Sequence, residues 1–222
     1  MNSLDSRYLR LGDTFAHRFV KAGTYHYAVT IHGGIELPSH HPRFEITVAK
    51  KPGSASKTHY VTVSYANGVF SVEPKTLRIK HNDVILWSTA SAATPGFAVN
   101  GESKAARFDS ANLPANSMYS HAFGTSGVFE WSSARDPKLN GTVTVAAHPP
   151  CHTEEDRSAY LKKLSQAVVV MIDAPKAHPK KISITVGQTV FFAVRSGEDV
   201  AIVDRTLLAA AQCMINPQPL PA

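Results

Sequence analysis

Histidines, with the hydroxyl, thiol and carboxyl groups near them, are the residues of this chain that could do chemistry. His32, His40 and His41 fall within one short segment, and imidazoles bind Cu(II), Zn or Ni. These three residues are therefore candidate metal ligands. The alternative is that His32 is a hydrogen-bonded polar residue and that His40 and His41 are exposed in a loop, and this second interpretation is favoured.

A Ser/His/Asp catalytic triad could in principle be formed by Ser132-Ser133, His121 and Asp136. A Ser/His/Asp triad is defined by geometry and not by residue counts, so these residues alone do not predict one. The chain has no P-loop, no dinucleotide fingerprint, no H-E-x-x-H and no G-x-S-x-G. His17 and His121 are interpreted as structural residues. The sequence therefore predicts a protein that is not an enzyme.

Two cysteines, Cys151 and Cys213, leave two alternatives open. They are two free thiols or one disulfide, and no C-x-x-C spacing supports a cysteine-based zinc site. His148 and His152 flank Cys151 and could add a weak metal site. We predict no cofactor.

Composition limits the class of protein. The 222 residues are 43% hydrophobic, which is enough for one large or two ordinary cores. The formal charge is +6, but the basic residues are scattered, so nucleic-acid binding is not expected. The sequence has no apolar run long enough for a transmembrane helix. It shows no secretory leader, so we expect a cytoplasmic protein, or a periplasmic or extracellular one if the chain belongs to a longer precursor.

Alternating apolar and polar residues predict an all-β fold. The clearest strands are Phe44–Val48, Tyr60–Tyr65 and Thr142–Val145. Asn140-Gly141 is interpreted as the turn before the last of these. One helix is predicted over 153–166, with Thr153 as N-cap and Asp156 three residues later, and a second over 205–214 with Asp204 as its cap.

An internal repeat changes the expected domain organisation. Two segments match at offsets of 104 and 105 residues, which indicates a repeating unit of about 105 residues. In the first pair of matching segments, His17, Phe19, Gly23, Tyr25 and Tyr27 correspond to His121, Phe123, Gly127, Phe129 and Trp131. In the second pair of matching segments, Pro74, Leu77, Ile79, Ile85 and Trp87 correspond to Pro179, Ile182, Ile184, Val190 and Phe192.

Residues 58–147 contain both kinds of segment, first the kind that includes Pro74, here called the early half, and then the kind that includes His121, here called the late half. Along the chain the order is a late half (1–50), an early and a late half (58–147), and an early half (167–204). A half-sandwich alone would expose an open edge. We therefore expect 58–147 to form one domain, 1–50 and 167–215 to form a second, and 148–166 to be a helical linker. In one alternative the end halves are exchanged between two chains as a swapped homo-oligomer. In another, the chain is part of a longer array.

The segment 127–145, GVFEWSSARDPKLNGTVTV, resembles the last two strands of a cupredoxin, the blue-copper β-sandwich. In cupredoxins, a strand of pattern G-x-Y-x-Y/F-x-C leads into a loop that carries copper ligands. The loop is followed by a second strand of pattern M-x-G-x-V-x-V. Residues 74–87 and 179–192 resemble the early strands of that family. The resemblance implies two cupredoxin-like Greek-key β-sandwiches with one or two short helices. An immunoglobulin-like or fibronectin-like sandwich is the alternative fold.

The resemblance also implies that the copper site is lost. In the 58–147 unit, Ser133 stands at the Cys position, Asp136 at the His position and Leu139 at the Met position. The first copper His would fall at Pro95 or Gly96. A blue-copper centre needs two imidazoles and a thiolate, which these residues do not supply.

The other unit is also without a thiolate. Its Cys position falls on Val29 and its Met position near Pro42, while His32 keeps one imidazole. The early His would fall at Val200 or Ala201. We therefore predict a non-catalytic structural or interaction protein, an accessory or scaffold subunit that binds protein partners in a larger, membrane-associated or electron-transfer complex. The alternative is a metal-binding or electron-transfer protein that uses His32 and His40 or His41.

Overall fold

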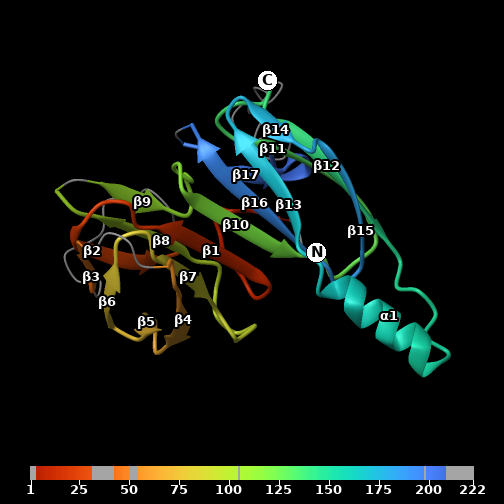
Figure 1. Cartoon of the computed structure of the whole chain (residues 1–222), viewed down its shortest axis with the longest axis horizontal. Coiled ribbons are helices and arrows are strands. Elements are labelled where there is room, and N and C mark those ends of the chain that lie inside the picture. The colour runs from red at the N-terminus through yellow and green to blue at the C-terminus, as the bar shows by residue number, and fades with distance from the viewer. Residues whose placement is uncertain (1–3, 32–42, 51–54, 105, 198, 209–222) are drawn as a thin grey trace, which may run out of the picture.

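The chain folds into three β-sheets and one well-formed helix. The computed structural model describes residues 4–31, 43–50, 55–104, 106–197 and 199–208. The sheets have eight, five and four strands, and α1 (Glu154–Leu164) extends at one end of the molecule (Figure 1). The expected all-β class is confirmed. Within the described part of the chain, no helix has the length and apolar character needed to cross a membrane.

The largest sheet runs through the whole molecule. In spatial order its strands are β14 (Lys176–His178), β13 (Val168–Asp173), β16 (Thr189–Ser196), β10 (Ser117–Ala122), β1 (Asp13–Arg18), β7 (Val84–Ser88), β4 (Thr58–Ala66) and β5 (Val69–Glu73). Strands such as β4, β7 and β16 alternate buried and more exposed side chains, as expected for a sheet with one face on a core. The two central strands, β1 and β10, instead bury consecutive residues.

The two smaller sheets pack on the same face of this large sheet and give two sandwich-like halves. Tyr27 of one small sheet contacts Trp87, and Trp131 of the other contacts Phe192. The five-stranded sheet is ordered β6 (Thr76–Lys80), β3 (Phe44–Ala49), β2 (Gly23–Thr30), β8 (Ala98–Glu102) and β9 (Arg107–Asp109). The four-stranded sheet is ordered β15 (Lys181–Thr185), β12 (Asn140–Ala146), β11 (Gly127–Ser133) and β17 (Ile202–Asp204).

The strand pairing corrects the expected assembly of the halves. Strands β2 and β3, from 1–50, pair with β8 and β6. Strands β11 and β12 pair with β17 and β15. Each late half therefore pairs with the early half that follows it in sequence. The expected domain formed from 1–50 and 167–215 is wrong, and so is the self-contained unit 58–147.

Loop closure explains this choice of partner. The two late halves carry the same residue pattern, so either could pair with either early half. Residues 50–57 and the segment that contains α1 are the short connections to the next early half. Pairing the two chain ends would instead close a loop of more than a hundred residues, at a higher entropy cost. The realised pairing avoids this long loop, because each late half pairs with the early half that follows it.

Strands β1 and β10 join the two halves at the centre of the large sheet. They are antiparallel neighbours, with Phe15 opposite Tyr119. These two residues are 104 positions apart, so the pairing relates equivalent positions of the two late halves. The N-terminal segment crosses to the other half as well, because Ser6 exchanges hydrogen bonds with Ile202.

The same aromatic contacts occur in both halves. Phe15 stacks on Trp87 with ring centroids 5.3 Å apart, and Tyr119 stacks on Phe192 at 5.9 Å. Tyr27 meets Trp87 edge-on at 5.8 Å, as Trp131 meets Phe192 at 5.2 Å. All of these rings are buried, so one core pattern is built twice.

The helix begins as predicted. Thr153 accepts a hydrogen bond from the Asp156 N–H, and the Asp156 carboxylate accepts one from the Thr153 N–H. This capping box supplies acceptors for two otherwise unpaired N–H groups. Residues 205–208 are also helical, with Asp204 accepting from the Thr206 N–H at 2.9 Å. The rest of the expected 205–214 helix lies outside the described residues.

Candidate binding site

The copper-ligand positions of the second half come together, but with a different partner from the one predicted. The Ser133 hydroxyl accepts hydrogen bonds from the N–H groups of Ala201 (3.4 Å) and Arg135 (3.3 Å). The structure thus brings Ser133 to Ala201, where the early His was expected. Leu139 is 1% exposed, and Asp136 accepts from the Lys138 N–H at 3.0 Å. These side chains are occupied in packing and turns.

In the first half the position that corresponds to Ser133 is Val29, which is apolar. Val29 is 2% exposed and lies opposite Val99 in the β2–β8 register. Gly96 lies against Tyr8 and Arg10, and a Cβ added to it would be 3.3 Å from the Tyr8 Cβ. Valine and glycine side chains offer no ligand atom to a metal.

The three histidines predicted as metal candidates, His32, His40 and His41, lie outside the described residues, so that hypothesis stays a prediction. The described residues contain no group of three His, Cys, Asp or Glu side chains that could hold a metal ion.

His121 belongs to a buried hydrogen-bond network and not to a triad with Ser133. Its Nδ1–H donates to Asp13 Oδ1 at 2.6 Å. The Tyr119 hydroxyl donates to the same oxygen at 3.1 Å. The Nε2 atom of His121 is buried without a hydrogen-bond partner among the described residues. Because Asp13 lies on β1 and His121 on β10, this network joins the two halves.

Tyr119 is held in its neutral form. Burial raises the pKa of its phenol well above the ordinary value, and the nearby Asp13 carboxylate raises it further. A neutral hydroxyl keeps the proton that it donates to Asp13. The interpretation of His121 as a structural residue fits this arrangement.

His17 occupies the corresponding place on β1 and has a neutral partner. Its Nδ1 lies 2.9 Å from the Ser117 hydroxyl, and the ring is 7% exposed. Burial lowers the pKa of His17 to about 4, because the charged imidazolium would lose its hydration.

This lowered pKa predicts a loss of stability on mild acidification. Between the ordinary His pKa of 6.5 and about 4, the unfolded chain binds a proton at His17 and the folded chain does not. The free energy of unfolding should therefore fall by about 2 kcal/mol between pH 7 and pH 5 from this residue alone. Urea unfolding of wild type and His17→Gln at both pH values measures it. An equal pH dependence in the two proteins would contradict the prediction.

The Cys151 cluster is exposed. The Cys151 Sγ lies 4.0 Å from His148 Nε2, and the His148 ring packs on Tyr160 with centroids 4.4 Å apart. Cys151 is a free thiol, and Cys213 lies outside the described residues. No third ligand joins this pair among the described residues.

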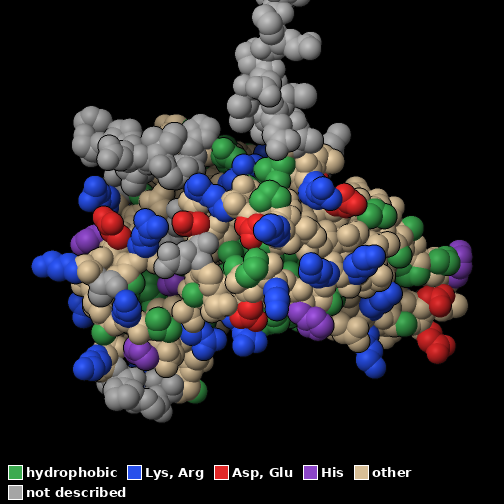
Figure 2. Space-filling model, turned by 90° about the horizontal axis from the view of Figure 1, so that it is seen from above, with side chains coloured by type: hydrophobic (Ala, Val, Ile, Leu, Met, Phe, Trp, Pro, Cys, Tyr) green, Lys and Arg blue, Asp and Glu red, His purple; other side chains and the backbone are tan. Residues whose placement is uncertain are grey.

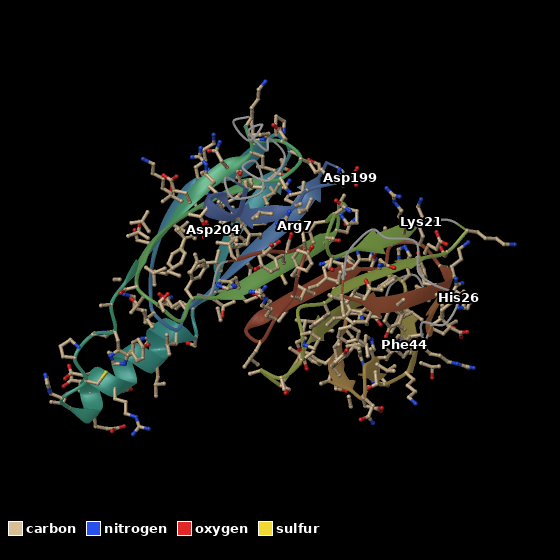
Figure 3. All side chains as sticks on the ribbon, turned by 180° about the vertical axis from the view of Figure 1, so that it is seen from behind. Arg7, Lys21, His26, Phe44, Asp199 and Asp204 are labelled. Atoms are coloured by element: carbon tan, nitrogen blue, oxygen red, sulfur yellow. The ribbon has the colours of Figure 1, made fainter. Side chains whose placement is uncertain are left out.

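A cavity on the outer side of β2 and β8 is the strongest candidate site. Its volume is about 830 Å³. Its lining combines small residues, among them Gly23, Ala28 and Gly101, with longer side chains. Its charged and ionisable lining residues are His26, Arg43, Glu102, Lys104 and Arg107. Figure 3 shows His26 on this side of the molecule, away from α1.

Strand register explains how these side chains meet. His26 of β2 lies opposite Glu102 of β8, and Glu102 lies opposite Arg107 of β9. Arg43 immediately precedes β3, so the antiparallel β2–β3 pairing sets it beside Ala28. Lys104 lies between β8 and β9. A small residue flanked by long ones on neighbouring strands leaves a hollow in a sheet face.

The electrostatic balance of the cavity is positive. Three lining residues are permanently cationic, and Glu102 is the single carboxylate. Among the described residues, the lining of this cavity forms one ion pair, between Arg107 and Asp199 at 3.9 Å, and both side chains are exposed. Such a long, exposed pair neutralises little charge. Lys and Arg side chains also outnumber acidic ones over the face seen in Figure 2.

Comparison with known proteins identifies no relative. No protein-family model, no curated protein and no solved structure matches this chain. The chemistry of the cavity must therefore be argued from its own residues. Its serine, Ser103, donates to the Ala106 carbonyl oxygen at 3.2 Å and closes a turn. Among its described residues the cavity thus presents mainly cations, and Ser103 is engaged in a turn.

The sequence analysis did not find this cavity. The available signal was the charged run from Glu102 to Arg107 between two short strands. His26 and Arg43 join it only through the register of the five-stranded sheet.

Proposed function

We propose that the protein is a non-catalytic interaction subunit of cupredoxin-like fold, without a type-1 copper site, that binds an acidic partner protein. The observation that carries the proposal is the cationic cavity, whose lining includes Arg43, Lys104 and Arg107. Accessory subunits need complementary surfaces and no catalytic groups, and this chain offers such a surface.

The absence of copper chemistry is supported at both thiolate positions. Val29 is buried and apolar, and Ser133 is bonded to backbone N–H groups. The double-sandwich interpretation is supported by aromatic contacts that recur in the two halves. In this proposal, a duplicated cupredoxin-like scaffold without a copper site uses its surfaces to bind partners.

An acidic partner is favoured by charge. Complementary charge accelerates association and excludes like-charged surfaces. Carboxylates of a partner could pair with Arg43 and Lys104, which form no ion pair within the described residues. His26 would add a donor beside them.

Charge reversal in the cavity tests the proposal. Arg43→Glu/Lys104→Glu should bind immobilised poly-L-glutamate about tenfold more weakly than wild type at low salt, because two favourable pairs become repulsive. Lys162→Glu/Lys163→Glu, on exposed positions of α1, changes the net charge equally and is the matched control. Salt-gradient elution and surface plasmon resonance provide the measurement.

Equal weakening in both double variants would show that net charge alone governs binding, and the proposed site would be rejected. The metal-binding alternative has its own test. One Cu(II) or Zn per chain after loading, lost in His32→Ala, would replace the non-metal assignment by a metal site.

A further inference from the structure

The outward face of the large sheet carries a second unexplained surface. Across its six central strands, from β4 to β13, one row of outward side chains is apolar on every strand. The paired positions of this row are Tyr60, Leu86, Ala16, Met118, Ala193 and Met171. The outward side of a solvated antiparallel sheet is normally polar, so this row is not explained by the fold alone.

The neighbouring row on the same strands is also uncharged. Its paired positions are Thr62, Ser88, Thr14, Ser120, Phe191 and Val169. The Thr14 and Ser120 hydroxyls bond each other at 2.7 Å. We call these two rows the outer face. None of its twelve positions is charged, although the chain has 23 Lys and Arg and 17 Asp and Glu. Interface centres are depleted of charge in this way.

Exposure across the outer face is uneven, because two of its central positions, Ala16 and Ser120, are only 2% and 1% exposed. Both smaller sheets pack against the opposite side, through Trp87 and Phe192. Tyr60 remains 69% exposed and Val169 39%. Charged residues border the outer face. Glu73 of β5 lies opposite Thr62, while Arg18, Asp173 and Arg195 lie along another border, where Arg195 pairs with Asp173 at 3.6 Å.

We propose that the outer face binds the outer face of a second copy of this chain. The outward side of all eight strands, about 4.8 Å apart and about six residues long, covers roughly 700–800 Å², and the outer face is its uncharged centre. This is close to the area that each partner buries in a stable interface. An acidic partner would be drawn to cations, which lie elsewhere, in the cavity. An uncharged face meets its own copy without like-charge repulsion, despite the net charge of +6.

The face has both a protruding and a hollow part. Tyr60 projects from β4, while a hollow of about 480 Å³ lies further along the same row. Its lining includes Ala16, Met118 and Ala193 of the outer face, together with Arg18 and Arg195 at the border. In a two-fold dimer each patch contacts its counterpart reciprocally. A projecting ring and a hollow on one face give the second copy a complementary shape.

Substitution of Tyr60 tests this dimer. Light scattering after gel filtration should give twice the chain mass of 24.0 kDa for wild type at concentrations of about 10–100 µM. Tyr60→Glu should weaken dimerisation by at least about tenfold, because it buries a charge in the interface. Val128→Glu is the matched control, since Val128 is 66% exposed on a strand of the other layer. Val169→Glu, at the other end of the outer face, serves as a second variant.

Each outcome decides the question. A wild-type monomer throughout this range overturns the proposal. A dimer that survives both Tyr60→Glu and Val169→Glu also overturns it, and is the result expected if the halves are instead exchanged between chains. Loss of the dimer in Val128→Glu alone places the interface on the other layer. The cavity experiment is independent of all these results, because its residues lie on the five-stranded sheet.

Discussion

Replacing Asp13 by alanine is expected to lower the free energy of unfolding by about 3–5 kcal/mol. The Asp13 carboxylate is 5% exposed and accepts hydrogen bonds from His121 Nδ1, the Tyr119 hydroxyl and the Arg10 N–H. Alanine would leave these donors without their acceptor. His121 Nε2 already has no partner among the described residues, so the variant leaves the ring with only the long 3.5 Å contact between Nδ1 and the Tyr119 hydroxyl.

The matched control is Ser117→Ala. Ser117 occupies the position 104 residues after Asp13 and bonds His17 at 2.9 Å, so it makes the corresponding contact in the other half. One neutral hydrogen bond is lost there, at a cost of about 1 kcal/mol. Urea unfolding followed by tryptophan fluorescence reports both losses. Equal costs for the two variants would show that the Asp13 network contributes no more than one ordinary hydrogen bond.

The Asp13 network is also expected to affect the cooperativity of unfolding between the two halves. Asp13 and His121 lie on the two strands that join the halves, and the core aromatics Phe15 and Tyr119 pair beside them. If this junction couples the halves, wild type unfolds in one transition. Asp13→Ala then separates the two halves into two transitions. The stability measurement therefore also reports how strongly the halves depend on each other.

Local patterns carried most of what the sequence could predict. Alternation placed strands where β3, β4 and β12 lie, because one face of each packs on a core. The Thr153 capping box depends on residues three apart, which the sequence displays directly. Such features need no knowledge of which distant segments meet.

The pairing of the halves could not be predicted in the same way. Equivalent positions carry aromatic side chains in both halves, as at Phe19 and Phe123 or at Trp87 and Phe192, so a residue pattern does not choose between the partners. The choice depends on connection lengths and on contacts between the halves, such as Asp13 with His121. The cavity was hidden for a related reason, since Arg43 and Lys104 become neighbours of His26 only through strand register.

Replacing Gly141 by alanine is expected to destabilise the fold by about 2–4 kcal/mol. The sequence analysis assigned Asn140-Gly141 to a turn, but Gly141 lies inside β12, directly opposite Trp131. An added Cβ would be 2.5 Å from the Lys180 carbonyl oxygen and 2.8 Å from the Trp131 ring. That oxygen accepts a hydrogen bond from the Thr142 N–H, so moving it would disturb the pairing of β12 with β15.

Gly96→Ala is the control that separates crowding from backbone entropy. Neither glycine requires a left-handed backbone, and the nearest atom to an added Cβ at Gly96 is a side-chain carbon at 3.3 Å. Alanine at Gly96 gains from the stiffer unfolded chain and meets a neighbour that can shift, so the net change should stay within about 1 kcal/mol. Thermal and urea unfolding compare the two variants. If Gly141→Ala were as stable as Gly96→Ala, the Trp131 ring would have room to move. The close approach of β12 to Lys180 would then not be what keeps glycine at this position.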